Sequence, residues 1–155
     1  MRLDPPSSCA QILVATVLSL ACLPAVAEPN QIRFPDLSTL EPYLSIDRGP
    51  VIETALTTRE AIEAVQSGLP IPDGTPVVLS FRKNGTLRRY FVMEKSAEQT
   101  QDIPEDLRAG DWRFQWFRAD GTVNTEADLA TCSACHRQRR GRDYLYTFHE
   151  LREAE

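Results

Sequence analysis

Cys132, Cys135 and His136 form a cluster near the C-terminus that constrains this chain more than any other feature of its sequence. Two cysteines at positions i and i+3 lie on one side of a helical turn, so their sulfur atoms can reach the two vinyl groups of one haem. The adjacent histidine is then held beneath the iron. C-x-x-C-H is the attachment signature of c-type haem. The sequence therefore predicts one covalent haem c, attached through Cys132 and Cys135, with His136 as the metal ligand.

Residues 1–27 have the pattern of an export signal. Arg2 precedes an apolar run from Ile12 to Leu23, which suits a signal-peptide core and is too short to span a membrane. Small residues at positions 25 and 27 match the pattern that signal peptidase recognises. We expect cleavage after Ala27 and a mature protein in the periplasm, free of the membrane. A short membrane anchor and lipid attachment at Cys22 are the alternatives.

Cleavage would leave Cys132 and Cys135 as the only cysteines, in an oxidising compartment where a pair of free thiols is unusual. A zinc site would need two more ligands, and the mature chain offers only His149 as a further histidine. A thioredoxin-type redox pair would open a helix after an early strand rather than lie near the end of the chain. Haem attachment explains the cluster better than either.

A second axial ligand for the iron is poorly provided. Met93 is the only methionine of the mature chain, and His149 is the only other histidine. Axial ligation largely decides what a haem does. An iron with one open position binds or activates small molecules, so the sequence favours that role over electron transfer.

The charge of the chain limits its partners. The formal net charge is -5 at pH 7, which gives no reason to expect a nucleic-acid partner. Four arginines nevertheless follow the cysteine motif, at positions 137, 139, 140 and 142. They could pair with haem propionates, attract an acidic redox partner, or simply be solvated.

Hydrophobic alternation and turn signals predict an α+β fold, mainly an antiparallel sheet with a few flanking helices. Residues 28–50 are rich in proline and are expected to be irregular, with a short helix as the alternative, and residues 51–155 are expected to form the haem-binding domain. Thr57 is expected to cap a helix over 58–67, with Glu60 completing a capping box. A short helix should lead from about residue 124 into the motif, and residues 142–151 fit helix or mixed structure. Strands are expected at 51–57, 76–83, 86–94 and 111–118.

Asn84-Gly85 predicts a hairpin with a two-residue loop, which pairs Lys83 with Thr86. Met93 then falls on the face away from Leu79 and cannot be an axial ligand if the Leu79 face contacts haem. A β-bulge would shift the register by one residue and reverse this conclusion. Core packing is the alternative role for this face, which is expected to carry Val77, Leu79, Phe81, Arg88, Tyr90 and Val92.

Two further patterns leave the role of their residues open. Trp112, Phe114 and Trp116 alternate along one expected strand, which favours a core stripe over a cofactor wall. Glu53 is either a buried acid or an outward-facing strand residue.

Three segments together resemble one known family. They are "Ile71-Pro-Asp-Gly-Thr" before a strand, "Asp111-Trp-Arg-Phe-Gln-Trp-Phe" before the motif, and "Cys132-Ser-Ala-Cys-His" followed by "Arg142-Asp-Tyr-Leu-Tyr-Thr". In order and spacing they resemble the cytochrome P-460 family, including the related cytochrome c′-beta proteins, over about residues 51–148. The resemblance implies a periplasmic haem protein with antiparallel β-structure, a homodimer, whose five-coordinate iron is held by His136.

The resemblance also implies two possible activities. Members with a lysine bonded to the haem edge oxidise hydroxylamine, whereas the c′-beta members bind nitric oxide or carbon monoxide. Leu79 occupies the position that matches this lysine, and leucine cannot form the bond. The leading expectation is therefore a five-coordinate haem that binds nitric oxide or carbon monoxide without a lysine cross-link, with Leu79, Phe81, Arg88 and Tyr90 around it. An enzyme acting on hydroxylamine, nitrogen oxides or peroxide is the alternative, followed by an electron-transfer cytochrome.

Overall fold

The computed structural model describes residues 32–98, 100, 103–104 and 108–155. The expected export signal over 1–27, its cleavage site after Ala27 and the alternative lipidation site at Cys22 lie outside the described residues. Within the described part of the chain, no helix is both long enough and apolar enough to cross a membrane.

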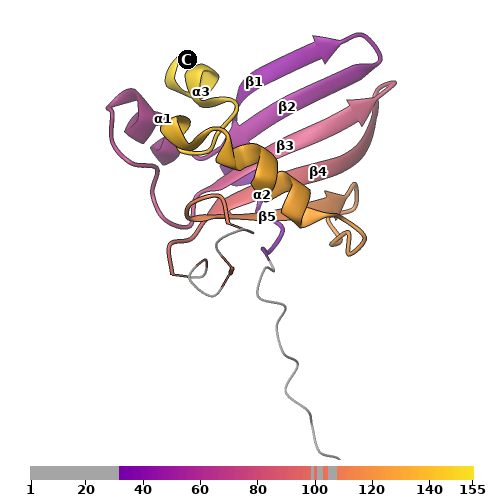
Figure 1. Cartoon of the computed structure of the whole chain (residues 1–155). Helices are drawn as coiled ribbons and strands as arrows, with labels where there is room; N and C mark the ends of the chain where they lie inside the picture. The colour runs from indigo at the N-terminus through magenta and orange to yellow at the C-terminus, as the bar shows by residue number, and fades with distance from the viewer. Residues whose placement is uncertain (1–31, 99, 101–102, 105–107) are drawn as a thin grey trace, which may run out of the picture.

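The described residues form a five-stranded antiparallel sheet whose strands lie side by side in sequence order (Figure 1). Its strands are β1 (Glu41–Arg48), β2 (Val51–Thr57), β3 (Pro76–Lys83), β4 (Thr86–Lys95) and β5 (Trp112–Arg118). Three α-helices flank it: α1 (Arg59–Gln66), α2 (Leu129–Arg137) and α3 (Phe148–Arg152). Two short 3₁₀ turns are η1 (Leu37–Thr39) and η3 (Arg140–Arg142). The expected mainly antiparallel fold with a few flanking helices is confirmed.

Each face of the sheet packs against a different part of the chain. On one face, α2 contacts β5, while α3 contacts both α1 and β1. Val77, Met93 and Phe114 point to this helical side, whereas Val78 and Val92 point to the other. The second face is covered by the segment before β1, through Ile32, Phe34, Leu37 and Leu40. Alternation along β3 and β4 thus builds two cores, and the helical side faces the cysteine motif.

The prediction that residues 28–50 are irregular was wrong for residues 41–48, which form the edge strand β1. Pro42 argued against a strand because proline cannot donate a ladder hydrogen bond. The structure places it in an edge strand, next to a register irregularity between Pro42 and Leu44. Both are positions where a sheet tolerates proline.

The N-cap of α1 lies one residue later than predicted. Thr58, not Thr57, is the N-cap, and its hydroxyl accepts a hydrogen bond from the backbone N–H of Ala61. Thr57 instead ends β2, where its fully buried hydroxyl donates to the carbonyl of Pro76. No capping box through Glu60 forms, because Glu60 lies two residues after the true cap rather than three.

The β3–β4 hairpin has the expected loop but not the expected register. Asn84 and Gly85 both adopt positive φ, 51° and 73°, and Lys83 pairs with Thr86 as predicted. A bulge then follows: Arg82 pairs with Leu87, whereas Phe81 pairs with Arg89. From there, Leu79 pairs with Phe91 and Val77 with Met93. The predicted pairs Phe81–Arg88, Leu79–Tyr90 and Val77–Val92 are therefore wrong, because one extra residue shifts every later side chain of β4 to the other face.

Candidate functional site

A cavity of about 410 Å³ lies between the helical side of the sheet and α2. Its walls are mostly apolar, as expected for a small-molecule or cofactor site of this size. The sheet contributes Tyr43, Glu53, Ala55, Val77, Leu79, Phe91, Val92, Met93, Phe114, Gln115 and Trp116, and the C-terminal part contributes Thr131, Cys132, Cys135, His136, Leu145, Tyr146 and Thr147.

Helix α2 carries the cysteine motif into this cavity. It begins at Leu129, five residues after the expected start at about residue 124. Its N-cap is Asp128, whose carboxylate accepts from the backbone N–H groups of Ala130 and Thr131. Cys132, Cys135 and His136 all line the cavity, and both cysteines are free thiols. Burial raises the pKa of the Cys132 thiol. One helix thus brings two thiols and an imidazole to the wall of the same cavity.

The ring of His136 has a defined orientation. Its Nδ1 lies 2.7 Å from the backbone carbonyl oxygen of Tyr144. A carbonyl can only accept, so Nδ1 carries the proton and Nε2 keeps a free lone pair. Burial lowers the pKa of His136, which favours the neutral, ligating form. The ring also packs against Phe114 and Tyr146, with centroids 4.9 and 5.2 Å away.

The four residues expected on the haem-facing side of the hairpin do not all lie on that side. Leu79 lines the cavity, half-buried. Phe81 lies on the same face but beyond the cavity, under the guanidinium of Arg89 at 5.1 Å. Tyr90 packs on the opposite face against Phe34, with ring centroids 5.0 Å apart, and Arg88 is exposed at the bulge. The expectation was therefore wrong for Tyr90 and Arg88, for the register reason given above.

The bulge brings two residues to the cavity that the expected register had excluded. Phe91 and Met93 occupy the positions assigned to Tyr90 and Val92. Trp112 and Phe114, 1% and 4% exposed, belong to the core that was expected for this stripe. Phe114 and Trp116 also line the cavity, so the stripe contributes to its wall as well. The sequence signal for Phe114 and Trp116 was their alternation along β5, which places both side chains on the side of the sheet that faces the cysteines. Met93 had no such signal, because the bulge leaves no clear trace in the sequence.

Two polar groups interrupt the apolar wall on the β1–β2 side. The Glu53 carboxylate lines the cavity with its side chain 16% exposed, and it pairs with Arg48 at 2.6 Å. The hydroxyl of Tyr43 lies 2.7 Å from that of Thr147. Burial raises the pKa of Tyr43 to about 12, so the phenol stays protonated at neutral pH. Glu53 is thus a partly buried acid on the cavity side of β2, ion-paired with Arg48, and neither of its two expected roles describes it fully.

Neither of the two lysines of the chain lines the cavity. Lys83 is exposed at the hairpin tip. Lys95 has a side chain only 13% exposed, and its ammonium contacts both carboxylate oxygens of Asp143 at 2.6 Å. His149 also lies away from the cavity, on α3, with Nδ1 3.2 Å from a guanidinium nitrogen of Arg152.

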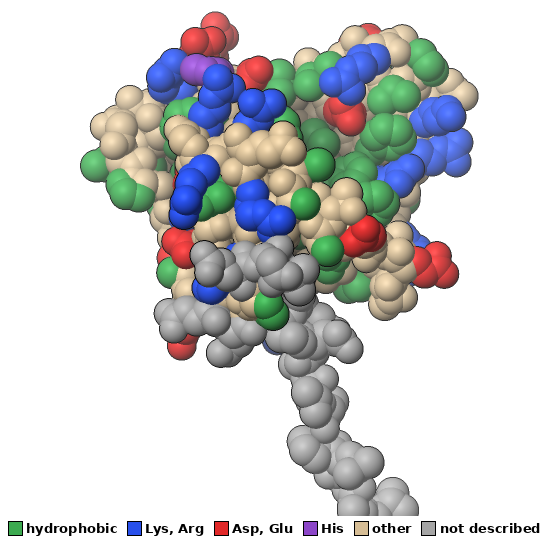
Figure 2. All heavy atoms as spheres, in the orientation of Figure 1, with side chains coloured by type: hydrophobic (Ala, Val, Ile, Leu, Met, Phe, Trp, Pro, Cys, Tyr) green, Lys and Arg blue, Asp and Glu red, His purple; other side chains and the backbone are tan. Residues whose placement is uncertain are grey.

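Arginines gather over α2 and the chain that follows it, on the face shown in Figure 2. Arg139 stacks on Tyr146, with its guanidinium 4.4 Å from the ring centroid. Arg137 and Arg140 line a separate polar cavity with Arg108. The cluster therefore combines an aromatic contact at the edge of the main cavity with exposed positive charge outside it.

The residues around the main cavity fit a c-type haem. Two free thiols three residues apart can form the thioethers, and the lone pair of His136 Nε2 can ligate the iron. The apolar walls can contact a macrocycle. A search of the curated proteins gives no match to this chain. The model of the family described as Cytochrome P460 matches residues 33–147, well over half of the chain and including the β1 segment that was expected to be irregular.

Proposed function

Because the chain belongs to the cytochrome P460 family, it is a haem-binding cytochrome, and we propose that its iron is five-coordinate and binds nitric oxide or carbon monoxide. We propose further that the haem is attached through Cys132 and Cys135 and ligated by His136. The observation that carries this proposal is the convergence of both thiols and the oriented imidazole on one mostly apolar cavity.

When bound, a haem iron with a single protein ligand supplies one open coordination position for a small molecule. The protein's own residues would then decide which molecule binds there. Leu79, Ala55 and Phe91 offer no hydrogen-bond donors and exclude water from their side of the cavity. Such a surface favours neutral diatomic molecules over ligands that require proton transfer.

The positions of the two lysines support a haem without a lysine cross-link. Leu79 occupies the cavity wall at the position matched to the cross-linking lysine. Lys95 is engaged by Asp143, and Lys83 is exposed at the far end of the hairpin. Forming the bond from Lys95 would require breaking a mostly buried ion pair, which costs several kcal/mol.

Replacing Leu79 with alanine should enlarge the cavity and speed the association of carbon monoxide. Leu79 is half-buried, so the loss of stability should fall at the low end of the range of about 2–5 kcal/mol for such truncations. Laser-flash photolysis measures the association rate, and urea denaturation measures the stability. Leu87→Ala is the matched control, because Leu87 lies in the same hairpin outside the cavity wall. Equal rates in Leu79→Ala and the wild type would refute the role of Leu79.

Oxidation of hydroxylamine is the second candidate function, and the position of Glu53 is the observation that favours it. A carboxylate in the cavity wall can accept protons that a substrate releases on oxidation. If this is the function, the wild type should turn over hydroxylamine and Glu53→Gln should lose most of that rate. Under the leading proposal, turnover stays slow in both proteins while nitric oxide binds to each.

We propose that the mature protein starts at Glu28, is periplasmic and forms a homodimer, in keeping with its family and the pattern of residues 1–27. N-terminal sequencing of the exported protein should give Glu28. A lipidated Cys22 or a retained signal would overturn this assignment. Light scattering of the purified protein tests the dimer.

A further inference from the structure

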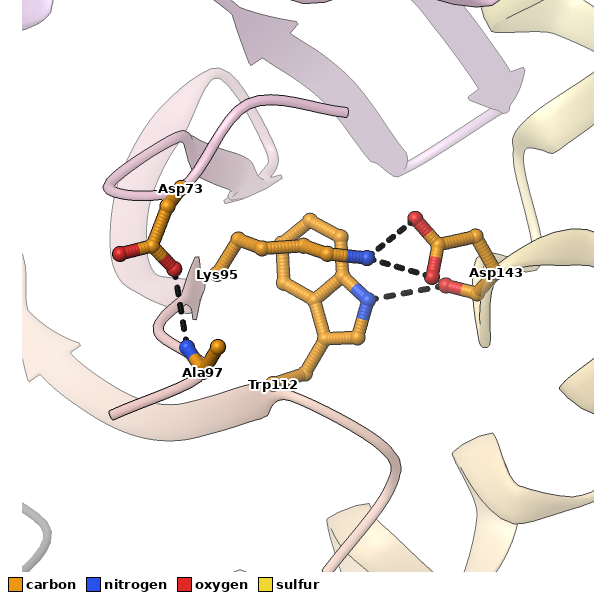
Figure 3. A network of polar contacts seen from close by, with 5 residues as sticks. All are labelled: Asp73, Lys95, Ala97, Trp112 and Asp143. Carbon is orange, nitrogen blue, oxygen red and sulfur yellow. Dashed lines mark hydrogen bonds and ion pairs between the residues drawn. The ribbon is translucent and has the colours of Figure 1, made fainter. Parts of the chain in front are cut away.

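Three segments distant in sequence meet around Asp143 (Figure 3). Lys95 at the end of β4 donates to both carboxylate oxygens of Asp143, at 2.6 Å each. Trp112 at the start of β5 donates from Nε1 to the backbone carbonyl of Asp143, at 2.9 Å. The backbone of Lys95 is itself paired with the turn before β3, through Gly74 and Thr75. Asp143 is therefore held by its side chain and by its backbone.

The backbone held in this way is in a conformation that L-residues rarely adopt. Asp143 has φ 45° and Tyr144 has φ 62°, both in the left-handed region. Each such residue costs on the order of 1–3 kcal/mol and persists only where its surroundings impose it. The ring of Tyr144 lies directly against Gly110, where any added Cβ would overlap it. The ion pair, the indole and the glycine all act on this turn, together with backbone hydrogen bonds from Tyr144 to Arg139 and from Leu145 to Arg142.

The turn directs the carbonyl of Tyr144 at His136. That carbonyl accepts the hydrogen bond from His136 Nδ1 at 2.7 Å, which fixes the proton on Nδ1 and leaves Nε2 of this cavity-lining ring unprotonated. Lys95 and Asp143 are mostly buried, with side chains 13% and 27% exposed. Burying two charges gives little net stability. A gain in folding stability therefore does not explain why Lys95 and Asp143 form a mostly buried ion pair.

We infer that Lys95 and Asp143 are positioning residues for His136: their ion pair holds the Tyr144 carbonyl in place and thereby selects the Nδ1–H tautomer. The link to iron ligation rests on the proposed function, but the tautomer itself does not. A carbonyl hydrogen bond to a ligating histidine increases the electron donation of the ring. The pair would therefore also strengthen the bond from His136 to the iron.

The test uses the mature chain without haem, labelled with ¹⁵N at histidine. The chain has only two histidines, so His149→Gln assigns the signals. The wild type should show His136 as the Nδ1–H tautomer, whereas Lys95→Met and Asp143→Asn should show a substantial Nε2–H fraction. Lys83→Met removes the exposed lysine as a matched control, and Lys95→Arg should restore the wild-type tautomer. Gly110→Ala should give the same mixture with the ion pair intact.

Unchanged Nδ1–H signals in folded Lys95→Met and Asp143→Asn would overturn the inference. In the haem-loaded protein, the same variants should lower the ferrous iron–histidine stretching frequency and raise the reduction potential. Failure of the wild type to acquire haem would count against the proposed function alone, because the tautomer is read without haem.

Discussion

Replacing both Cys132 and Cys135 with alanine is expected to abolish covalent haem attachment. Each sulfur supplies one thioether, so the single variants should retain haem through one bond and the double variant through none. The structure supports this because Cys132 and Cys135 form no disulfide with each other and both line one cavity. The measurement is the intact mass of protein expressed with a c-type haem maturation system: one added haem in the wild type and no added haem in the double variant.

Ser133→Ala is the matched control, since Ser133 lies between the two cysteines on the same helix. It should carry the full mass of one haem. Covalent haem in the double variant would refute the attachment site. A wild type that carries zinc or two unmodified thiols after maturation would refute the haem interpretation of the motif as a whole.

Replacing Trp112 with alanine should cause a large loss of folding stability, about 3–5 kcal/mol. Trp112 is 1% exposed in the core on the helical side of the sheet, and its Nε1 donates to the backbone of Asp143. Truncation removes the ring and leaves that carbonyl without its donor. Urea denaturation followed by circular dichroism measures the loss.

Two variants separate these contributions. Trp112→Phe keeps most of the ring but removes the donor, so it should cost less than alanine. Leu69→Ala, at a side chain 62% exposed, should change stability by no more than about 0.5 kcal/mol. A loss below about 1 kcal/mol in Trp112→Ala would contradict the position of Trp112 in the core.

The sequence was most informative where a local signal and the tertiary environment agree. Asn84-Gly85 predicted the hairpin loop correctly because only residues that tolerate positive φ fit it. The strands at 51–57 and 76–83 were predicted within their observed bounds. The three motif residues could be placed around one volume because helical spacing alone brings them together.

Other features depend on contacts that no local pattern encodes. The bulge next to Phe81 moved Tyr90 and Arg88 off the expected face and brought Phe91 and Met93 to the cavity. The strand β1 was not predicted because its segment is rich in proline, which an edge strand tolerates and an inner strand does not. The carbonyl that orients His136 comes from a strained turn eight residues further on, and the contacts of that turn with Lys95, Trp112 and Gly110 are not encoded in any local pattern.

The presence of Met93 in the cavity wall makes the number of iron ligands the central question. The most direct test is the optical spectrum of the ferrous, haem-loaded protein with and without carbon monoxide, for the wild type and for Met93→Leu. Our account predicts a five-coordinate haem c that binds carbon monoxide, with the same spectrum in both proteins before the gas is added. A six-coordinate spectrum that is lost in Met93→Leu would contradict it, as would the spectrum of a cross-linked haem.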